Sequence, residues 1–371
     1  MPISNIKENL ELARNRLLEL DMVESIIEES TPAESTTTEE SRKIVIFSDV
    51  SLERYRKFRG EGELKRSNIY VRLVRGEIIA YEMPSPAHAS VAAILSHMLL
   101  LWSNRQLVVY SELDITVGNS EYCTDIAAEP KQNPPPAIGS VPQPTIIIEV
   151  ARTETLTSLD SLPVDYFSAN AQTNLTQVYL AIKIFDRRQD STAAMLAILY
   201  LRNNQVPNPA LNVPNPPPNT PPTITANAIP NLAISFGTAP LNRQPTAFIN
   251  NTGMPNGRLT GFLQRTDVAC TLAGMPNYQL TIPANLIFPG GVPARVPNNF
   301  TIDLWEVQQE ALYRLVCIAF TLLMIYYYRY LLIFFYIFSN INLGFLLTDI
   351  LLNLLLLICF SNCILNRFFF R

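Results

Sequence analysis

Two carboxylates on either side of a proline-rich gap are the residues of this sequence best suited to chemistry. Asp125 follows Cys123-Thr124, and Glu149 lies inside the apolar run 145–150. The β-branched neighbours of Glu149 favour an extended strand, in which a buried carboxylate is costly unless a cation pairs with it. Two carboxylates on neighbouring strands make an oxygen site for Mg²⁺, which needs one or two of them together with phosphate and water. The pair therefore predicts a divalent-metal site.

A simpler interpretation of the same two residues stays open. A Glu at the end of a strand often faces solvent, an Asp after Thr often starts a turn, and buried acids are rare. Under this alternative neither side chain binds a metal.

A wider set of short motifs favours the metal site. In chain order these motifs are Gly76-Glu77-Ile78, Met83-Pro84-Ser85-Pro86-Ala87-His88, Thr124-Asp125, Ile148-Glu149-Val150-Ala151, Asp160 and Tyr166. Over residues 48–185 their order and intervals resemble the Uma-type restriction endonuclease family, a branch of the PD-(D/E)XK nucleases.

The resemblance implies metal-dependent hydrolysis of a DNA phosphodiester. Asp125 and Glu149 would bind Mg²⁺ or Mn²⁺, and Glu77 would be a further catalytic acid. The metal would lower the pKa of bound water and neutralise charge on the phosphate, while a lysine supports the nucleophile. The role of His88, which follows the Pro-Ser-Pro element, is left open by the resemblance.

Four positions depart from the pattern of that family. Ala151 and Leu162 stand where lysines are expected, Thr124 replaces a proline, and Arg72 replaces an acid. Lys183, on the next strand, could act as a migrated catalytic lysine, or its ammonium could reach solvent from a strand edge. The alternative function is therefore a noncatalytic, membrane-anchored binding or scaffold protein that keeps the nuclease fold.

The hydrophobic periodicity predicts the elements that would position these residues. Strands are expected at 43–47, 69–74, 77–81, 107–117, 123–127, 145–150, 177–185, 278–288 and 300–305, with helices beginning near Ser51, Pro86 and Asp160. The fold class that follows is α/β, or α+β, with a mixed central sheet flanked by helices.

Composition divides the chain into six parts. We expect an amphipathic helix at 1–29, a disordered Ser/Thr/Pro/Glu linker at 30–43, and a restriction-endonuclease-like core at 44–200. A Pro/Asn-rich insertion at 201–276, terminal strands of the core at 277–310 and a hydrophobic tail at 311–371 complete the order.

Charge and cysteine content limit the partners. The chain has a net charge of -4, and its basic concentration lies at Arg56, Lys57, Arg59, Lys65, Arg66 and Arg72. These side chains could hold DNA phosphates, or they could form a solvated face balanced by Glu53, Glu61 and Glu63. The 5 cysteines and 2 histidines form no zinc or disulfide pattern, which fits a reducing compartment, and the N-terminus does not read as a secretory signal.

The hydrophobic tail predicts a transmembrane helical hairpin. Residues 315–338 and 343–365 are each long enough to cross a bilayer, although Arg329 and Asp349 interrupt them. Arg314 and Arg371 flank the hairpin, which favours membrane localisation with the N-terminal domain in the cytosol. The alternative is that a T-rich noncoding strand encodes this run, in which case the protein is intracellular and soluble. A transcript spanning the junction near Tyr313 would distinguish the two.

Overall fold

The computed structural model describes residues 3–26, 44–60, 64, 67–132, 137–168, 175–204 and 228–315. The chain divides into two compact units at residues 1–315 and 316–371, and every described residue lies in the first. The predicted linker and nearly all of both predicted membrane spans lie outside the described residues.

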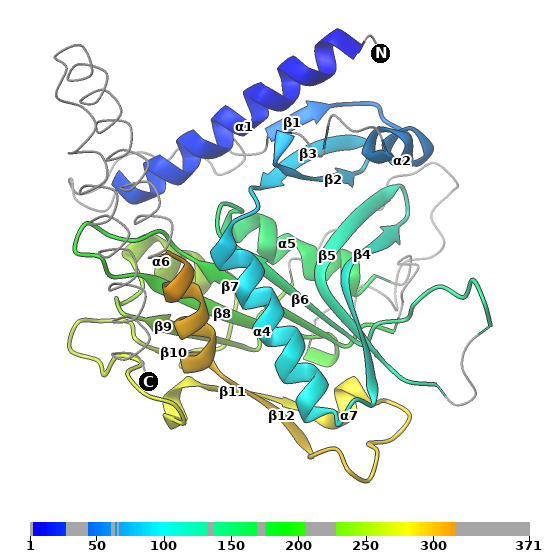
Figure 1. Cartoon of the computed structure of the whole chain (residues 1–371). Helices are drawn as coiled ribbons and strands as arrows, with labels where there is room; N and C mark the ends of the chain where they lie inside the picture. The colour runs from blue at the N-terminus through cyan, green and yellow to red at the C-terminus, as the bar shows by residue number, and fades with distance from the viewer. Residues whose placement is uncertain are drawn as a thin grey trace, which may run out of the picture. The chain divides into compact units, whose positions relative to one another are not determined.

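A ten-stranded sheet organises the described part of the chain (Figure 1). Its strand order is β1-β3-β2-β5-β6-β7-β8-β9-β10, and β4 pairs with β5 off this path. The pairs β6–β7 and β9–β10 are parallel and the others are antiparallel, so the predicted mixed sheet is confirmed. The strands are β1 (Ile44–Phe47), β2 (Tyr70–Val74), β3 (Glu77–Glu82), β4 (Leu107–Val117), β5 (Ser120–Pro130), β6 (Ile146–Ala151), β7 (Val178–Ile184), β8 (Ala194–Leu201), β9 (Leu232–Gly237) and β10 (Leu259–Gly261).

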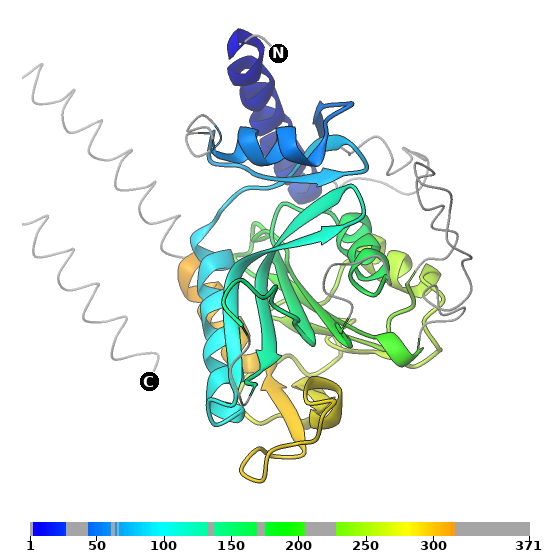
Figure 2. The same cartoon turned by 90° about the vertical axis from the view of Figure 1, so that its right-hand side faces the viewer.

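Helices cover both faces of the part of the sheet from β4 to β9. On one face lie α4 (Pro86–Trp102) and the helix over residues 304–315, and on the other lie α5 (Leu156–Tyr166) and α6 (Arg243–Asn251) (Figure 2). Separate hydrophobic clusters fill the two interfaces. Strands β6 and β7 are buried along their whole length, which explains their continuous apolar sequences.

Helix α4 begins where its local sequence directs it to begin. The Ser85 side chain accepts a hydrogen bond from the backbone N–H of His88 at 3.1 Å, and Pro86 occupies the first turn. Val91, Leu95 and Leu99 are fully buried on one side of the helix. This cap places His88 in the first turn, next to the sheet.

The N-terminal elements have their own hydrophobic cluster, formed by α1 (Ile3–Ile26), α2 (Leu52–Gly60) and strands β1–β3. Leu10 and Leu17 are buried there, so α1 packs on the domain. Leu18, another apolar residue of that helix, is 42% exposed.

Three parts of the fold differ from the predictions. Strand β8 was not predicted, and the described part of the predicted insertion contains β9, α6, β10 and a 3-10 turn, η3 (Pro276–Tyr278), of which β9 and β10 belong to the large sheet. Strands β11 (Gln279–Pro283) and β12 (Asn299–Asp303) pair with each other in a second sheet instead of extending the first, and the short helix α7 (Ala284–Ile287) follows β11. A second 3-10 turn, η2 (Arg202–Asn204), follows β8.

Within the described residues, no helix combines the length and the apolar character needed to cross a membrane.

Candidate functional site

Asp125 and Glu149 lie opposite each other at the end of the β5–β6 ladder. The ladder pairs Ile126 with Ile148, and the next facing positions are these two acids. Glu149 Oε2 accepts a hydrogen bond from the backbone N–H of Asp125 at 3.2 Å, while Asp125 Oδ2 accepts one from the backbone N–H of Val150 at 2.7 Å. We call this reciprocal arrangement the carboxylate clamp. It replaces backbone ladder bonds where the strands separate.

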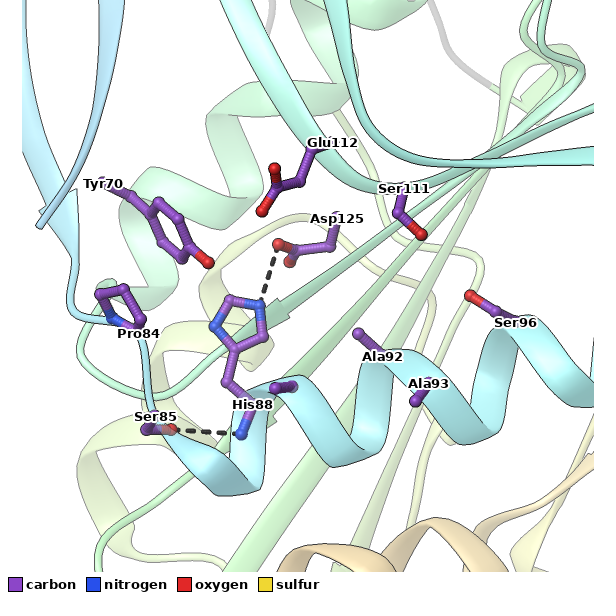
Figure 3. Close-up of a pocket in the computed structure, with 11 residues that line it drawn as sticks. Tyr70, Pro84, Ser85, His88, Ala92, Ala93, Ser96, Ser111, Glu112 and Asp125 are labelled. Carbon is purple, nitrogen blue, oxygen red and sulfur yellow. Dashed lines mark hydrogen bonds and ion pairs between the residues drawn. The ribbon is translucent and has the colours of Figure 1, made fainter. Parts of the chain in front are cut away.

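The remaining oxygens of the two acids also have protein donors. His88 Nε2 lies 2.9 Å from Asp125 Oδ1, a contact that Figure 3 shows from α4 to the sheet. The Tyr166 hydroxyl, at the end of α5, lies 2.7 Å from Glu149 Oε1. Each carboxylate oxygen of the pair therefore contacts a protein hydrogen-bond donor.

The environment of Glu149 disfavours its ionised form. Its side chain is 5% exposed. Burial raises the pKa of Glu149 well above its usual value, and the charge of Asp125 raises it further, while Tyr166 and Arg72 act in the opposite direction.

Arg72 is buried beside these acids. Its guanidinium Nη2 lies 2.6 Å from Glu154 Oε1, and its Cζ lies 3.5 Å from the centroid of the Tyr81 ring. Glu154 also accepts a hydrogen bond from Ser158. The resemblance thus expects an acid where this chain has Arg72. The guanidinium of Arg72 instead pairs with Glu154, 82 residues away in the sequence.

Lys183 lies next to Ala151, because the parallel register pairs these two residues. Its ammonium donates to the carbonyl oxygens of Arg152 and, at 2.8 Å, of Glu154. The lysine therefore stands beside the position where the resemblance expects one, but these contacts hold the loop that follows β6.

Glu82 holds the same loop from the other side. Its carboxylate accepts backbone hydrogen bonds from Arg152, Thr153 and Glu154 at 2.8–3.1 Å. Neither Glu82 nor Glu154 was predicted from the sequence. Glu82 continues the alternation of β3, but nothing in that alternation identified its partner loop.

Glu77 does not join this group. It begins β3, and Glu82 ends that strand, so the two are separated by about 17 Å at roughly 3.3 Å per residue. The structure therefore gives no support to Glu77 as a further catalytic acid.

Three described members of the predicted basic cluster pair with acids of the domain itself. Arg56 contacts Glu121 at 2.6 Å, Arg59 contacts Asp114, and Arg72 is buried as described above. These acids lie on the β4–β5 hairpin and differ from those named in the solvated-face alternative. The members of the cluster outside the described residues are Lys65 and Arg66.

A pocket of about 270 Å³ opens beside the clamp. Figure 3 shows its lining, in which α4 supplies His88 and small side chains, β4 supplies Ser111 and Glu112, and β2 supplies Tyr70. Asp125 belongs to this lining and Glu149 does not. Of the two carboxylates, only that of Asp125 therefore opens onto this pocket.

Asp125 and Glu149 are the residues that would hold the predicted Mg²⁺ or Mn²⁺. Within the described ranges, no three His, Cys, Asp or Glu side chains come together as a metal site. The oxygens of the clamp already contact protein donors, and Arg72 supplies positive charge where the resemblance expects a further acid.

Comparisons with known proteins returned little. No protein-family profile and no curated protein matches the chain. Among solved structures, a candidate nuclease belonging to DUF820 from Anabaena variabilis is similar at 16% sequence identity and a TM-score of 0.32. The match covers 42% of this chain and 82% of that one.

Proposed function

We propose that this chain is a noncatalytic binding protein built on a nuclease-like fold. The observation that carries the proposal is the buried Arg72–Glu154 ion pair, at the position where a metal-dependent nuclease of the resembled family would carry an acid.

A fixed guanidinium changes what this site can do. Arg72 compensates the negative charge of Glu154 and lowers the pKa of nearby Glu149, and both of these are tasks that a bound metal would otherwise perform. A divalent cation placed here would be repelled by Arg72 and would compete with the donors of the clamp. Because a protein loses much stability when one partner of a buried ion pair is removed, the Arg72–Glu154 pair is not easily displaced.

The second candidate function is a Mg²⁺- or Mn²⁺-dependent endonuclease acting on DNA. The direct opposition of Asp125 and Glu149 across β5 and β6 favours it. It also requires Lys183 to leave the loop carbonyls, and it requires a metal to bind beside Arg72.

A cleavage assay separates the two functions. The purified full-length chain is incubated with supercoiled and linear DNA in the presence of Mg²⁺ or Mn²⁺, beside an Asp125→Ala variant. We expect no cleavage above the level of the variant. Metal-dependent cleavage by the wild type that disappears in Asp125→Ala would establish the endonuclease and refute the proposal.

A further inference from the structure

The turn before β10 contains the one Asn-Gly pair of the sequence, Asn256-Gly257. This turn runs from Pro255 to Arg258 and is closed by a hydrogen bond from the Arg258 N–H to the Pro255 carbonyl oxygen at 3.2 Å. Gly257 has a φ of 79°, which is the conformation of the third residue of a type II turn. All four residues of the turn are exposed, so water reaches both Asn256 and Gly257.

Neither reacting group of this pair is held in place by a neighbour. Among the described residues, the Asn256 side chain and the Gly257 N–H have no hydrogen-bond partner. Nothing lies within 4 Å of the position that a Cβ on Gly257 would take. The turn is closed by one hydrogen bond at the long end of the usual range, and a glycine tolerates the rotation that brings its nitrogen toward the side chain of Asn256.

This arrangement allows the asparagine to lose its amide group without an enzyme. The Gly257 nitrogen gives its proton to water and attacks Cγ of Asn256, the Cγ–Nδ2 bond breaks, and ammonia leaves with a proton taken from water. The product is a five-membered succinimide ring. Water then opens the ring at one of its two carbonyl groups, which gives either aspartate or isoaspartate at this position. The sum of these steps exchanges an amide for a carboxylate and releases ammonia, so the reaction needs only water.

We propose that Asn256 is a self-modification site, at which the folded chain converts to isoaspartate and aspartate, and that the isoaspartate form loosens β10. Strand β10 has 3 residues and ends the strand order of the large sheet (Figure 1). Just before it, the Arg258 carbonyl oxygen accepts a hydrogen bond from the Ala233 N–H of β9 at 3.0 Å. Isoaspartate adds one methylene group to the main chain and leaves a new carboxylate, so it displaces this carbonyl oxygen and the short ladder that follows it.

Peptide mass spectrometry of the full-length chain, incubated at mildly alkaline pH, tests the chemistry. We expect the peptide that contains Asn256 to gain the mass of an amide-to-acid exchange and to separate into an isoaspartate and an aspartate form. The rate should rise with pH, because the attacking nitrogen must lose its proton. Asn251 and Asn299 are internal controls, since both are exposed but are followed by Thr252 and Phe300. We expect conversion at these controls to be about tenfold slower or more, which corresponds to a barrier higher by ~1.4 kcal/mol.

Hydrogen exchange tests the structural consequence. We expect the amide hydrogens of β10 to exchange faster after incubation than before it, while those of β6 and β7 keep their rates. Asn256→Gln keeps an amide at this position but lengthens the ring that must close, so incubation should change neither its mass nor its exchange. Asn256→Asp adds the charge without the extra methylene group, and its β10 should exchange as in the fresh wild type.

Four results would each overturn the inference. These are no mass change at Asn256, equal conversion at Asn251 or Asn299, a mass change that persists in Asn256→Gln, and unchanged exchange of β10 in the fully converted protein. None of these measurements depends on whether the chain cleaves DNA, so the proposed function and this inference fail separately.

Discussion

At the scale of single residues, Arg72 is surrounded by groups that need its charge. Its guanidinium pairs with buried Glu154, lies over the Tyr81 ring and lowers the pKa of Glu149. Positive charge in a low-dielectric interior is stable only with such partners. Arg72 is therefore a structural cation of the site.

Replacing Arg72 with Met should destabilise the fold by about 3–5 kcal/mol, because Glu154 would remain buried without its partner. The double variant Arg72→Met/Glu154→Gln should recover a large part of this loss. Urea unfolding measures the stability of the single and of the double variant. Lys57→Met, on the exposed side of α2, is the control and should change stability by less than about 0.5 kcal/mol. Equal stability of Arg72→Met and Lys57→Met would mean that the Arg72–Glu154 ion pair does not contribute to the stability of the fold.

The raised pKa of Glu149 predicts how the free energy of unfolding changes with pH. Burial, and then Asp125, raise the pKa of Glu149 above 4.5, so the folded protein holds a proton that the unfolded chain has released. The stability contributed by this group is fully present below the unfolded pKa and is lost as the pH rises through the folded pKa. We expect the free energy of unfolding of the wild type, relative to Glu149→Gln, to fall as the pH rises above the unfolded pKa of Glu149, by at most ~1.4 kcal/mol per pH unit. A relative stability that rises over this range would show that Glu149 is ionised when folded.

At the scale of elements, two glycines hold the strands at the far end of the sheet. Gly261 ends β10 with a φ of 92°, and a Cβ on it would lie 2.0 Å from the carbonyl oxygen of Ser235. Gly237 ends β9, where a Cβ would lie 2.4 Å from the carbonyl oxygen of Ala193. Because both obstacles are backbone atoms, only displacement of a strand could relieve the contact.

Gly261→Ala should therefore destabilise the fold by about 3 kcal/mol or more, combining strain at positive φ with the steric clash. Gly257→Ala is the control, since it also has a positive φ of 79° but nothing lies within 4 Å of the added Cβ. We expect about 1–2 kcal/mol for the control. Denaturant unfolding of the two variants checks this, and equal losses would contradict the placement of β10 against β9.

The elements also show what the sequence can reveal and what it cannot. The β-branched runs at β2, β6 and β7 predicted strands correctly, and Ser85 with Pro86 predicted the start of α4. Strand β8 was missed because its Ala, Leu and Met residues are also good helix formers and do not alternate with polar ones. Strand β9 was also missed, because prolines lie close to it on both sides.

The site was only partly predictable for a related reason. Asp125 and Glu149 were recognised as a pair from motif order, and the structure places them opposite each other. The partners of Arg72 and Lys183 could not be identified from the sequence. These partners lie in the loop after β6, which is far in sequence from Arg72 and from Lys183. Contacts of this kind depend on tertiary packing and leave no periodic signal.

At the scale of the whole molecule, the described residues form one unit that ends at Leu315, and the hydrophobic tail follows it. The prediction of a membrane hairpin rests on the apolar content of residues 316–371, which are outside the described ranges.

We expect the full-length chain to sediment with membranes and to resist alkaline extraction, because two spans of this length bury a large apolar surface in the bilayer. A chain ending at residue 315 should remain in the supernatant. Recovery of the full-length chain as a monomer without detergent would refute the anchor.

The long strand β5 joins two parts of the sheet that have separate hydrophobic clusters. Strand β2 meets β5 through one pair of facing residues, Leu73 and Glu121, whereas β6 pairs along its full length with β7. We expect the part formed by β1–β3 to open before β6 and β7 once Arg72 and Glu82 release the loop after β6, so that its amide hydrogens exchange with solvent first. Tyr70 of β2 and Asp125 of β5 line the same pocket, so a ligand held between them would tie the opening of one part to the other and slow this exchange.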